Sequence, residues 1–374
     1  MDNSRFRFSI NPRINNICNE FRENKINKFD LLRFKKGKNM MKRIFPFIFS
    51  LLLLWGCGPD NPYERDINVD GVHVDIQRLE KDLFSADPDS IHRIIPTFNE
   101  RYGKFFDLYN KNVVHLGTSN SRAYPDNLRG FLTDHNMNQL HDKIQEVFPG
   151  MGEIEERIEE GFRHYKHYFP DKTVPAVYTY QGGFNQSIVV ADSVLAIGLD
   201  KYLGRDCAFY DKLGWSAYRQ KNMHKEKIPT DCMRAWGQSE WPFNDSTDNL
   251  LSNMLYRGKL LYFTKSMLPR AHDTLVSGFT GPELKWCRNN EEQIWNYLID
   301  HKLLYSTDYM TINKMVNPAP FTSGFPQESP GQAVNWLGWK IIEAYMEEKS
   351  SVTLKALMED QDYQKILNAS KYQP

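Results

Sequence analysis

The sequence predicts an α+β fold that is mostly helical and contains a small antiparallel sheet. Apolar residues recur at helical spacing over most of the chain. Runs rich in Val, Ile and Tyr are confined to residues 174–199. The remaining helical patterns follow these runs rather than alternating with them, which favours an α+β architecture over an alternating α/β one.

The first elements lie before this sheet. We expect the folded domain to begin near Val72, where "VHVDIQRLE" alternates like a short strand. Asp87 is placed to cap the next helix, with Pro88 at its first position. Two more helices are split at Pro149-Gly150. The second has an apolar stripe at helical spacing, formed by Met151, Ile154, Ile158, Phe162 and Tyr165.

The sheet itself is expected from three short strands at about 174–180, 186–190 and 194–199. The pattern breaks at Gly182-Gly183 and again at Asp192-Ser193, and both breaks are typical of turns. Short strands joined by such turns predict an antiparallel meander.

Helices make up the rest. In "LLSNMLYRGKLLYF" the apolar positions fall on one face, and Gly258 would let a neighbouring helix approach closely. Gly338 lies on a similar stripe in "SPGQAVNWLGWKIIEAYMEEK". Two capping boxes are predicted to begin helices. They pair Thr280 with Glu283 and Ser329 with Gln332, and Pro330 would occupy the first position of the second helix.

Charge limits the classes of partner. The 374 residues have no formal net charge, but residues 1–43 contain twelve Lys/Arg and only four Asp/Glu. The rest of the chain therefore has a net charge of −8. A chain of that charge without a basic stripe is a poor candidate for nucleic-acid binding.

The N-terminal region resembles a lipoprotein signal. Lys42 and Arg43 precede an apolar run, Ile44 to Trp55, which is too short to span a bilayer, and then Gly56-Cys57. "LWGC" resembles a bacterial lipobox, so Cys57 is the expected lipidation site and the protein's membrane anchor. We interpret residues 1–39 as an upstream extension, 40–56 as the signal peptide, 57–71 as a tether and 72–374 as one domain.

Metal-binding and nucleophilic motifs are missing from the sequence. There is no CxxC motif, and no two histidines lie four residues apart. His164 and His167 lie three apart at an expected helix end, where a structural role is favoured. Two of the three cysteines Cys207, Cys232 and Cys287 could pair in an exported protein, and the pairing stays open. No catalytic residue, metal or cofactor is predicted.

Several stretches together resemble the gliding-motility lipoprotein GldB family. They are the lipobox, "VLAIGLDKYLG", "LLSNMLYRGKLLYF", "ELKWCRNNEEQIWNYLIDHKLLYSTD" and "ESPGQAVNWLGWKIIEAYM". The resemblance runs from about Cys57 to the C-terminus. It implies a lipid-anchored protein of the cell envelope, in the outer membrane. Its expected partners are other envelope proteins of the gliding and associated secretion machinery.

The helix around Gly258 and the "SPGQAVNWLGWKII" stretch also resemble, more distantly, predicted zinc-dependent peptidases. In that family an HExxH helix lies between the sheet and the Gly258-type helix. Here the corresponding stretch, "IPTDCMRAWGQSEWPF", has no histidine. The position that corresponds to a third metal ligand is Arg257-Gly258-Lys259. Because a cation opposes a divalent metal, the resemblance implies a zincin-like, non-enzymatic scaffold. Its old groove would contain Arg257, Lys259, Glu328, Trp336 and Trp339.

Three functional hypotheses therefore stay open. The first is a non-enzymatic envelope protein that acts through protein contacts, for which a filled cleft is expected. The second is a hydrolase with an unconventional site, for which convergent carboxylates of raised pKa are expected. The third is a surface module that binds peptide or glycan, for which an open aromatic groove is expected.

Overall fold

A computed structural model describes residues 61–374, except 65–66, 68, 70, 245 and 247. The predicted extension, signal peptide and lipidated Cys57 lie outside the described residues. Within them, none of the helices is both long and apolar enough to cross a membrane.

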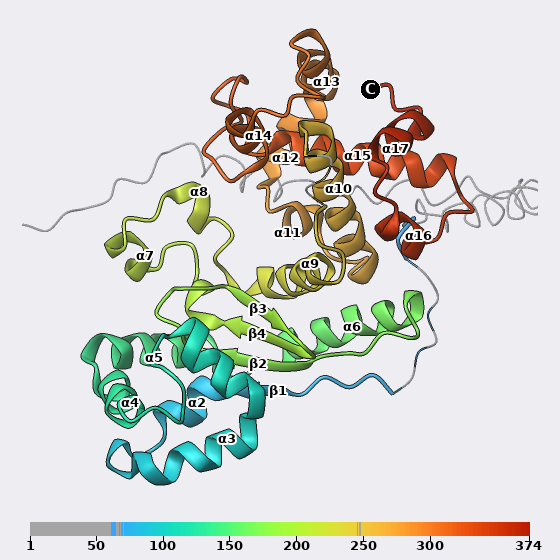
Figure 1. Cartoon of the computed structure of the whole chain (residues 1–374). Helices are drawn as coiled ribbons and strands as arrows, with labels where there is room; N and C mark the ends of the chain where they lie inside the picture. Colours follow the sequence, from blue (N-terminus) through green and yellow to red (C-terminus); the bar gives the residue numbers. More distant parts are fainter. Residues whose placement is uncertain (1–60, 65–66, 68, 70, 245, 247) are drawn as a thin grey trace, which may run out of the picture. The chain divides into compact units, whose positions relative to one another are not determined.

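The predicted α+β fold, mostly helical, is confirmed, but the sheet is mixed (Figure 1). Its order is β1-β2-β4-β3, with β1 (Ile76–Arg78), β2 (Ala176–Tyr180), β3 (Ile188–Ala191) and β4 (Val194–Gly198). β1, β2 and β4 are parallel, and only β3 runs antiparallel to its neighbour.

The three predicted strands are present, and β3 and β4 form the expected antiparallel hairpin, but the meander is wrong because β2 pairs in parallel with β4. β4 is buried at every position, whereas most of β3 is only partly buried. The chain places the continuously apolar strand in the centre of the sheet and leaves β3 at the edge. Near-continuous apolar runs are typical of parallel strands covered on both faces.

Helices cover both faces of this sheet (Figure 1). α2 (Leu79–Phe84), α3 (Ile91–Leu108) and α4 (Tyr124–Thr133) form one core with alternate sheet residues, among them Tyr178 and Ala196. α6 (Gly152–Tyr168), α9 (Ile228–Glu240) and α10 (Leu250–Met267) share the other core with Val177, Leu195 and Ile197. This alternation follows from the two-residue period of a strand.

The remaining elements are also helical. The N-terminal ones are η1 (Pro88–Ser90), η2 (Tyr109–Val113), α5 (His135–Val147), η3 (Leu199–Lys201), α7 (Ala208–Lys212), α8 (Ala217–Gln220) and η4 (Lys225–Lys227). The C-terminal ones are α11 (Asp273–Ser277), α12 (Gly281–Asn289), α13 (Glu291–Asp300), α14 (Tyr309–Val316), α15 (Ala333–Glu348), α16 (Leu354–Glu359) and α17 (Tyr363–Ser370).

Most helix signals in the sequence are confirmed. Asp87 caps η1, and Pro88 is the first residue of that 3₁₀-helix. α5 ends and α6 begins on either side of Pro149-Gly150, and the stripe from Met151 to Tyr165 is buried. The capping box of Thr280 and Glu283 begins α12.

The second predicted capping box is wrong, because α15 begins at Ala333 rather than at Pro330. Gln332 is left-handed, with φ at 67°, and makes no side-chain cap. The buried hydroxyl of Thr322 instead donates to Pro330 O at 2.6 Å and accepts from Ala333 N at 2.9 Å. A residue from the preceding loop thus caps α15, which a local pattern does not reveal.

The predicted close helix contacts at Gly258 and Gly338 are confirmed, and the structure shows that α10 and α15 contact each other there. A Cβ at Gly258 would overlap the backbone of Gly338, and a Cβ at Gly338 would overlap Met254 O. α10 is buried on nearly all sides, not on a single face. The two helices therefore form the centre of the larger core.

The folded unit starts earlier than the expected boundary at Val72. Asn61 donates from its side chain to Pro269 O at 2.9 Å. Tyr63 is buried and accepts from the indole N–H of Trp339 at 3.0 Å. The three cysteines whose pairing was open, Cys207, Cys232 and Cys287, are all buried free thiols.

Gly338→Leu should lower the free energy of unfolding by roughly 1–3 kcal/mol, or prevent folding, because the side chain meets the backbone of α10. Urea unfolding checks this. Gly130→Leu is the matched control, since a Cβ there meets no atom within 4 Å. Equal stability of the two variants would contradict the close packing of α10 and α15.

Candidate functional site

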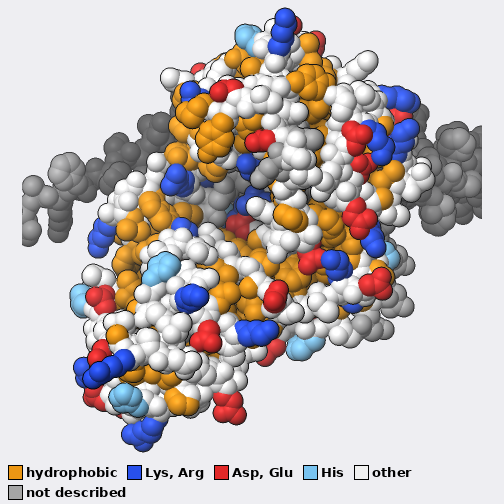
Figure 2. Space-filling model, in the orientation of Figure 1, with side chains coloured by type: hydrophobic (Ala, Val, Ile, Leu, Met, Phe, Trp, Pro, Cys, Tyr) orange, Lys and Arg blue, Asp and Glu red, His pale blue; other side chains and the backbone are white. Residues whose placement is uncertain are grey.

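A cavity of about 460 Å³ opens beside the sheet, between α9 and the segments that follow α11 and α14. We call it the basic cleft, because Asp231 is the single acid among its described lining residues, against five cations. The hollow and the Lys and Arg side chains near it are visible in Figure 2. The five cations are Lys201, Arg219, Lys221, Lys227 and Arg234.

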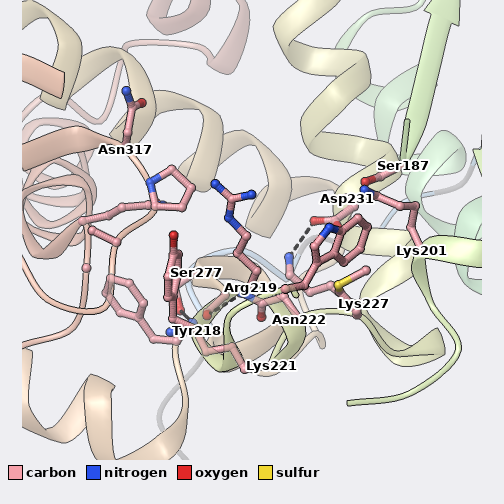
Figure 3. Close-up of a pocket in the computed structure, with 18 of the residues that line it drawn as sticks. Ser187, Lys201, Tyr218, Arg219, Lys221, Asn222, Lys227, Asp231, Ser277 and Asn317 are labelled. Carbon is pink, nitrogen blue, oxygen red and sulfur yellow. Dashed lines mark hydrogen bonds and ion pairs between the residues drawn. The ribbon is translucent and has the colours of Figure 1, made fainter. Parts of the chain in front are cut away.

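The polar side of α9, together with Lys227 just before it, lines the cleft (Figure 3). Lys227, Asp231 and Arg234 are spaced by four and three residues, so they share a side of the helix. The opposite side buries Ile228, Cys232 and other apolar residues in the core. The amphipathic pattern of α9 therefore turns this charged triplet towards the cavity.

The triplet is held together by Asp231. Its Oδ1 lies 2.7 Å from Lys227 Nζ and 3.0 Å from Arg234 Nη2, and its Oδ2 accepts from Tyr202 at 3.0 Å. Burial alone would raise the pKa of Asp231, but the two cations hold that pKa below its ordinary value. Burial lowers the pKa of Lys227 to about 8, and Arg234 adds repulsion. Two cations thus share one carboxylate.

Two further cations of the basic cleft have no carboxylate partner among the described residues. Lys201 lies 4.0 Å from the ring centroid of Trp215, and its Nζ donates to Phe184 O at 3.1 Å. Arg219 extends from α8 and is exposed. Lys221 differs, because Glu283 lies 2.7 Å from its Nζ.

A second cavity, of about 240 Å³, shares Arg234, Ser277, Phe279, Pro318 and Gln332 with the basic cleft. It adds Arg257, whose guanidinium donates to Asn317 Oδ1 at 3.1 Å. Burial and the neighbouring Arg234 lower the pKa of Arg257. Asn335 also lines this cavity, and its buried Oδ1 accepts no hydrogen bond from the described residues.

The structure brings together only part of the predicted groove. Arg257 and Trp336 line the second cavity, although Trp336 is only 1% exposed. Trp339 is equally buried, and Glu328 is exposed on the loop before α15. Lys259 points elsewhere, donating to Met358 O at 3.0 Å and Asp360 O at 2.8 Å.

The residues present do not fit the zinc site that the expected peptidase resemblance would require. No group of three or more His, Cys, Asp or Glu side chains among residues 61–374, gaps excluded, is arranged to hold a metal ion. The carboxylate of Asp231 is already shared by two cations. A divalent cation placed there would face Lys227 and Arg234, so the donor set suits an anion instead.

The basic cleft was not among the sites predicted from the sequence. The signal on α9 was present as a polar stripe, Lys227, Asp231 and Arg234, opposite apolar residues. Lys201, Arg219 and Arg257 join it from three other elements, and no sequence pattern connects them.

Asp231→Asn should lower the free energy of unfolding by about 3 kcal/mol at pH 7, because it leaves two cations unpaired. The native pKa of Asp231 is lowered, so its contribution is present above the unfolded pKa and is lost as pH falls through the native pKa. Urea unfolding at pH 7 and below pH 4 should therefore show a difference from the parent that shrinks with acidification.

Asp89→Asn is the control for Asp231→Asn, since the Asp89–Arg129 pair is exposed and should contribute little. An equal loss in both variants, or a loss that does not change with acidification, would contradict the assigned role of Asp231.

Comparison with known proteins agrees with the resemblance seen in the sequence. No curated protein and no solved structure matches this chain at a significant level. The family model described as gliding motility protein GldB matches residues 60–374, which is nearly the whole described unit. The chain therefore belongs to the gliding motility protein GldB family.

Proposed function

We propose that this protein is a lipid-anchored, non-enzymatic component of the cell envelope that supports gliding or the associated secretion machinery through protein contacts. Membership of the GldB family supports the link to motility and the envelope. The lipobox-like sequence at Gly56-Cys57 supports a lipid anchor in the outer membrane.

The composition of the basic cleft carries the non-enzymatic part of this proposal. α9 lies between the sheet and α10, where the similar peptidases have their HExxH helix. Its cleft-facing side chains are Lys227, Asp231 and Arg234. The two cations would repel a metal ion. A general base would require a raised pKa, whereas the pKa of Asp231 is lowered. A zincin-like scaffold converted to binding is consistent with both features.

The openness of the cleft favours a binding role over a purely structural one. A filled cleft was expected for the first hypothesis and an open aromatic groove for the third, and this cavity measures about 460 Å³. Trp215, Tyr218 and Phe279 line it together with the cations. Aromatic and arginine side chains are enriched at protein interfaces. Contact with a partner protein through this cleft is therefore part of the proposal.

Cys57→Ser should release the protein from membranes or leave it as unprocessed precursor. Membrane fractionation and labelling with a fatty-acid analogue measure this. Cys18→Ser is the matched control and should stay membrane-bound, and a chain started at Met40 should localise like the full one. A Cys57→Ser protein that remains processed, labelled and membrane-bound would refute the anchor.

The purified full chain should contain substoichiometric zinc, and chelators should leave its melting temperature and its lack of peptidase activity unchanged. The reason is the donor set, in which two cations occupy the position of a metal. Elemental analysis and a thermal melt with EDTA provide the measurement. One tightly bound zinc per chain, lost together with a peptidase activity on chelation, would restore the enzyme hypothesis.

A further inference from the structure

We propose that the basic cleft and the adjoining second cavity bind an acidic peptide segment of a partner protein, with its carboxylates on Arg219, Arg234 and Arg257. This rests on the proposed function and specifies the chemistry of the contact. The chain outside residues 1–43 is acidic overall, with a net charge of −8. A cavity lined by five cations and one acid on such a chain favours binding of a negatively charged ligand.

The charge balance of the two cavities is the first argument. Lys221 is neutralised by Glu283, and Asp231 compensates one of the pair Lys227 and Arg234. Lys201, Arg219 and Arg257 have no carboxylate within 4 Å among the described residues. The charge of Lys201 is balanced in part by the neighbouring Asp200. About three positive charges therefore remain uncompensated around one connected space. A ligand with several carboxylates would relieve their mutual repulsion. Burial, and after it the charge of Arg234, lowers the pKa of Arg257.

The distribution of these charges favours an extended ligand over a small ion. Arg219 and Arg234 line the basic cleft from α8 and α9, and Arg257 lines the second cavity from α10. A single phosphate reaches only part of such a set. In an extended peptide, side chains on the same edge are about 7 Å apart, so alternate acidic residues can contact more than one of these arginines.

The uncharged lining supplies a second argument for a peptide. Trp215, Tyr218 and Phe279 offer apolar surface between the cations. Asn335 is only 7% exposed, and its Oδ1 has no donor among the described residues. That oxygen needs an N–H or O–H group, which a peptide backbone provides and a phosphomonoester dianion does not.

The test selects peptides from a random twelve-residue phage library on the full-length protein in detergent. Selected sequences should be enriched in Asp and Glu. A synthetic selected peptide should bind more weakly as salt rises, and its Gln/Asn version should lose most of its affinity. Arg219→Gln/Arg257→Gln should weaken binding at least tenfold. Neither arginine makes an ion pair among the described residues, so the melting temperature should stay within a few degrees.

Arg93→Gln/Arg122→Gln is the matched control, because both are exposed arginines near α3 and α4, on the other side of the sheet. Its peptide affinity should equal that of the parent. Selection without acidic enrichment, or unchanged affinity in Arg219→Gln/Arg257→Gln, would overturn the proposal. So would arginine-dependent binding of inorganic pyrophosphate or phosphatidylglycerol vesicles when acidic peptides do not bind.

Complementation of a deletion strain separates this inference from the proposed function. If Arg219→Gln/Arg257→Gln loses peptide binding and also motility or secretion, the inference and the proposed function both stand. If that variant restores full motility or secretion, the cleft is not the contact and the inference is refuted alone. If deletion of the whole chain leaves motility and secretion unchanged, the proposed function itself is refuted.

Discussion

The contact between α10 and α15 at Gly258 and Gly338 is the constraint on which the rest of the helical half depends. Two backbones meet there without intervening side chains, so the helices can be neither rotated nor separated without losing the fit. Arg257 precedes Gly258 in the chain, and Asn335 lies one turn before Gly338. The close contact therefore fixes two polar residues of the second cavity relative to each other.

The charged residues of the basic cleft depend on the position of α9. Its apolar side joins the core that contains α6 and α10, and this burial turns Lys227, Asp231 and Arg234 outward. The carboxylate is shared by the two cations and by Tyr202, so the triplet is rigid and remains positively charged. Apolar residues in place of the buried Lys and Asp would often be at least as stable, so stability alone does not account for these charges.

The chemistry of the cleft is the inverse of a metal centre. A metallopeptidase places anionic and neutral donors around a cation, whereas this chain places cations around an empty space with one shared acid. These charged side chains lie on the side of α9 that faces away from the core, so the apolar side of the helix is not involved.

The sequence by itself determined the features that depend on neighbours along the chain. Asp87 and the Thr280 capping box act within one turn, and the stripe from Met151 to Tyr165 reports burial of a single helix. The small residues Gly258 and Gly338 indicated a close contact, though not that each is the other's partner. The family resemblance likewise needed only local motifs.

Tertiary structure decided the order of the strands, the start of α15 and the composition of the cleft. β4 lies between β2 and β3 because its burial on both faces outweighs the short turns that suggested a meander. α15 starts at Ala333 because Thr322, eleven residues earlier, provides the cap. Lys201, Arg219, Arg234 and Arg257 converge from four separate elements. Their convergence arises from long-range packing of the helices, which local periodicity does not encode.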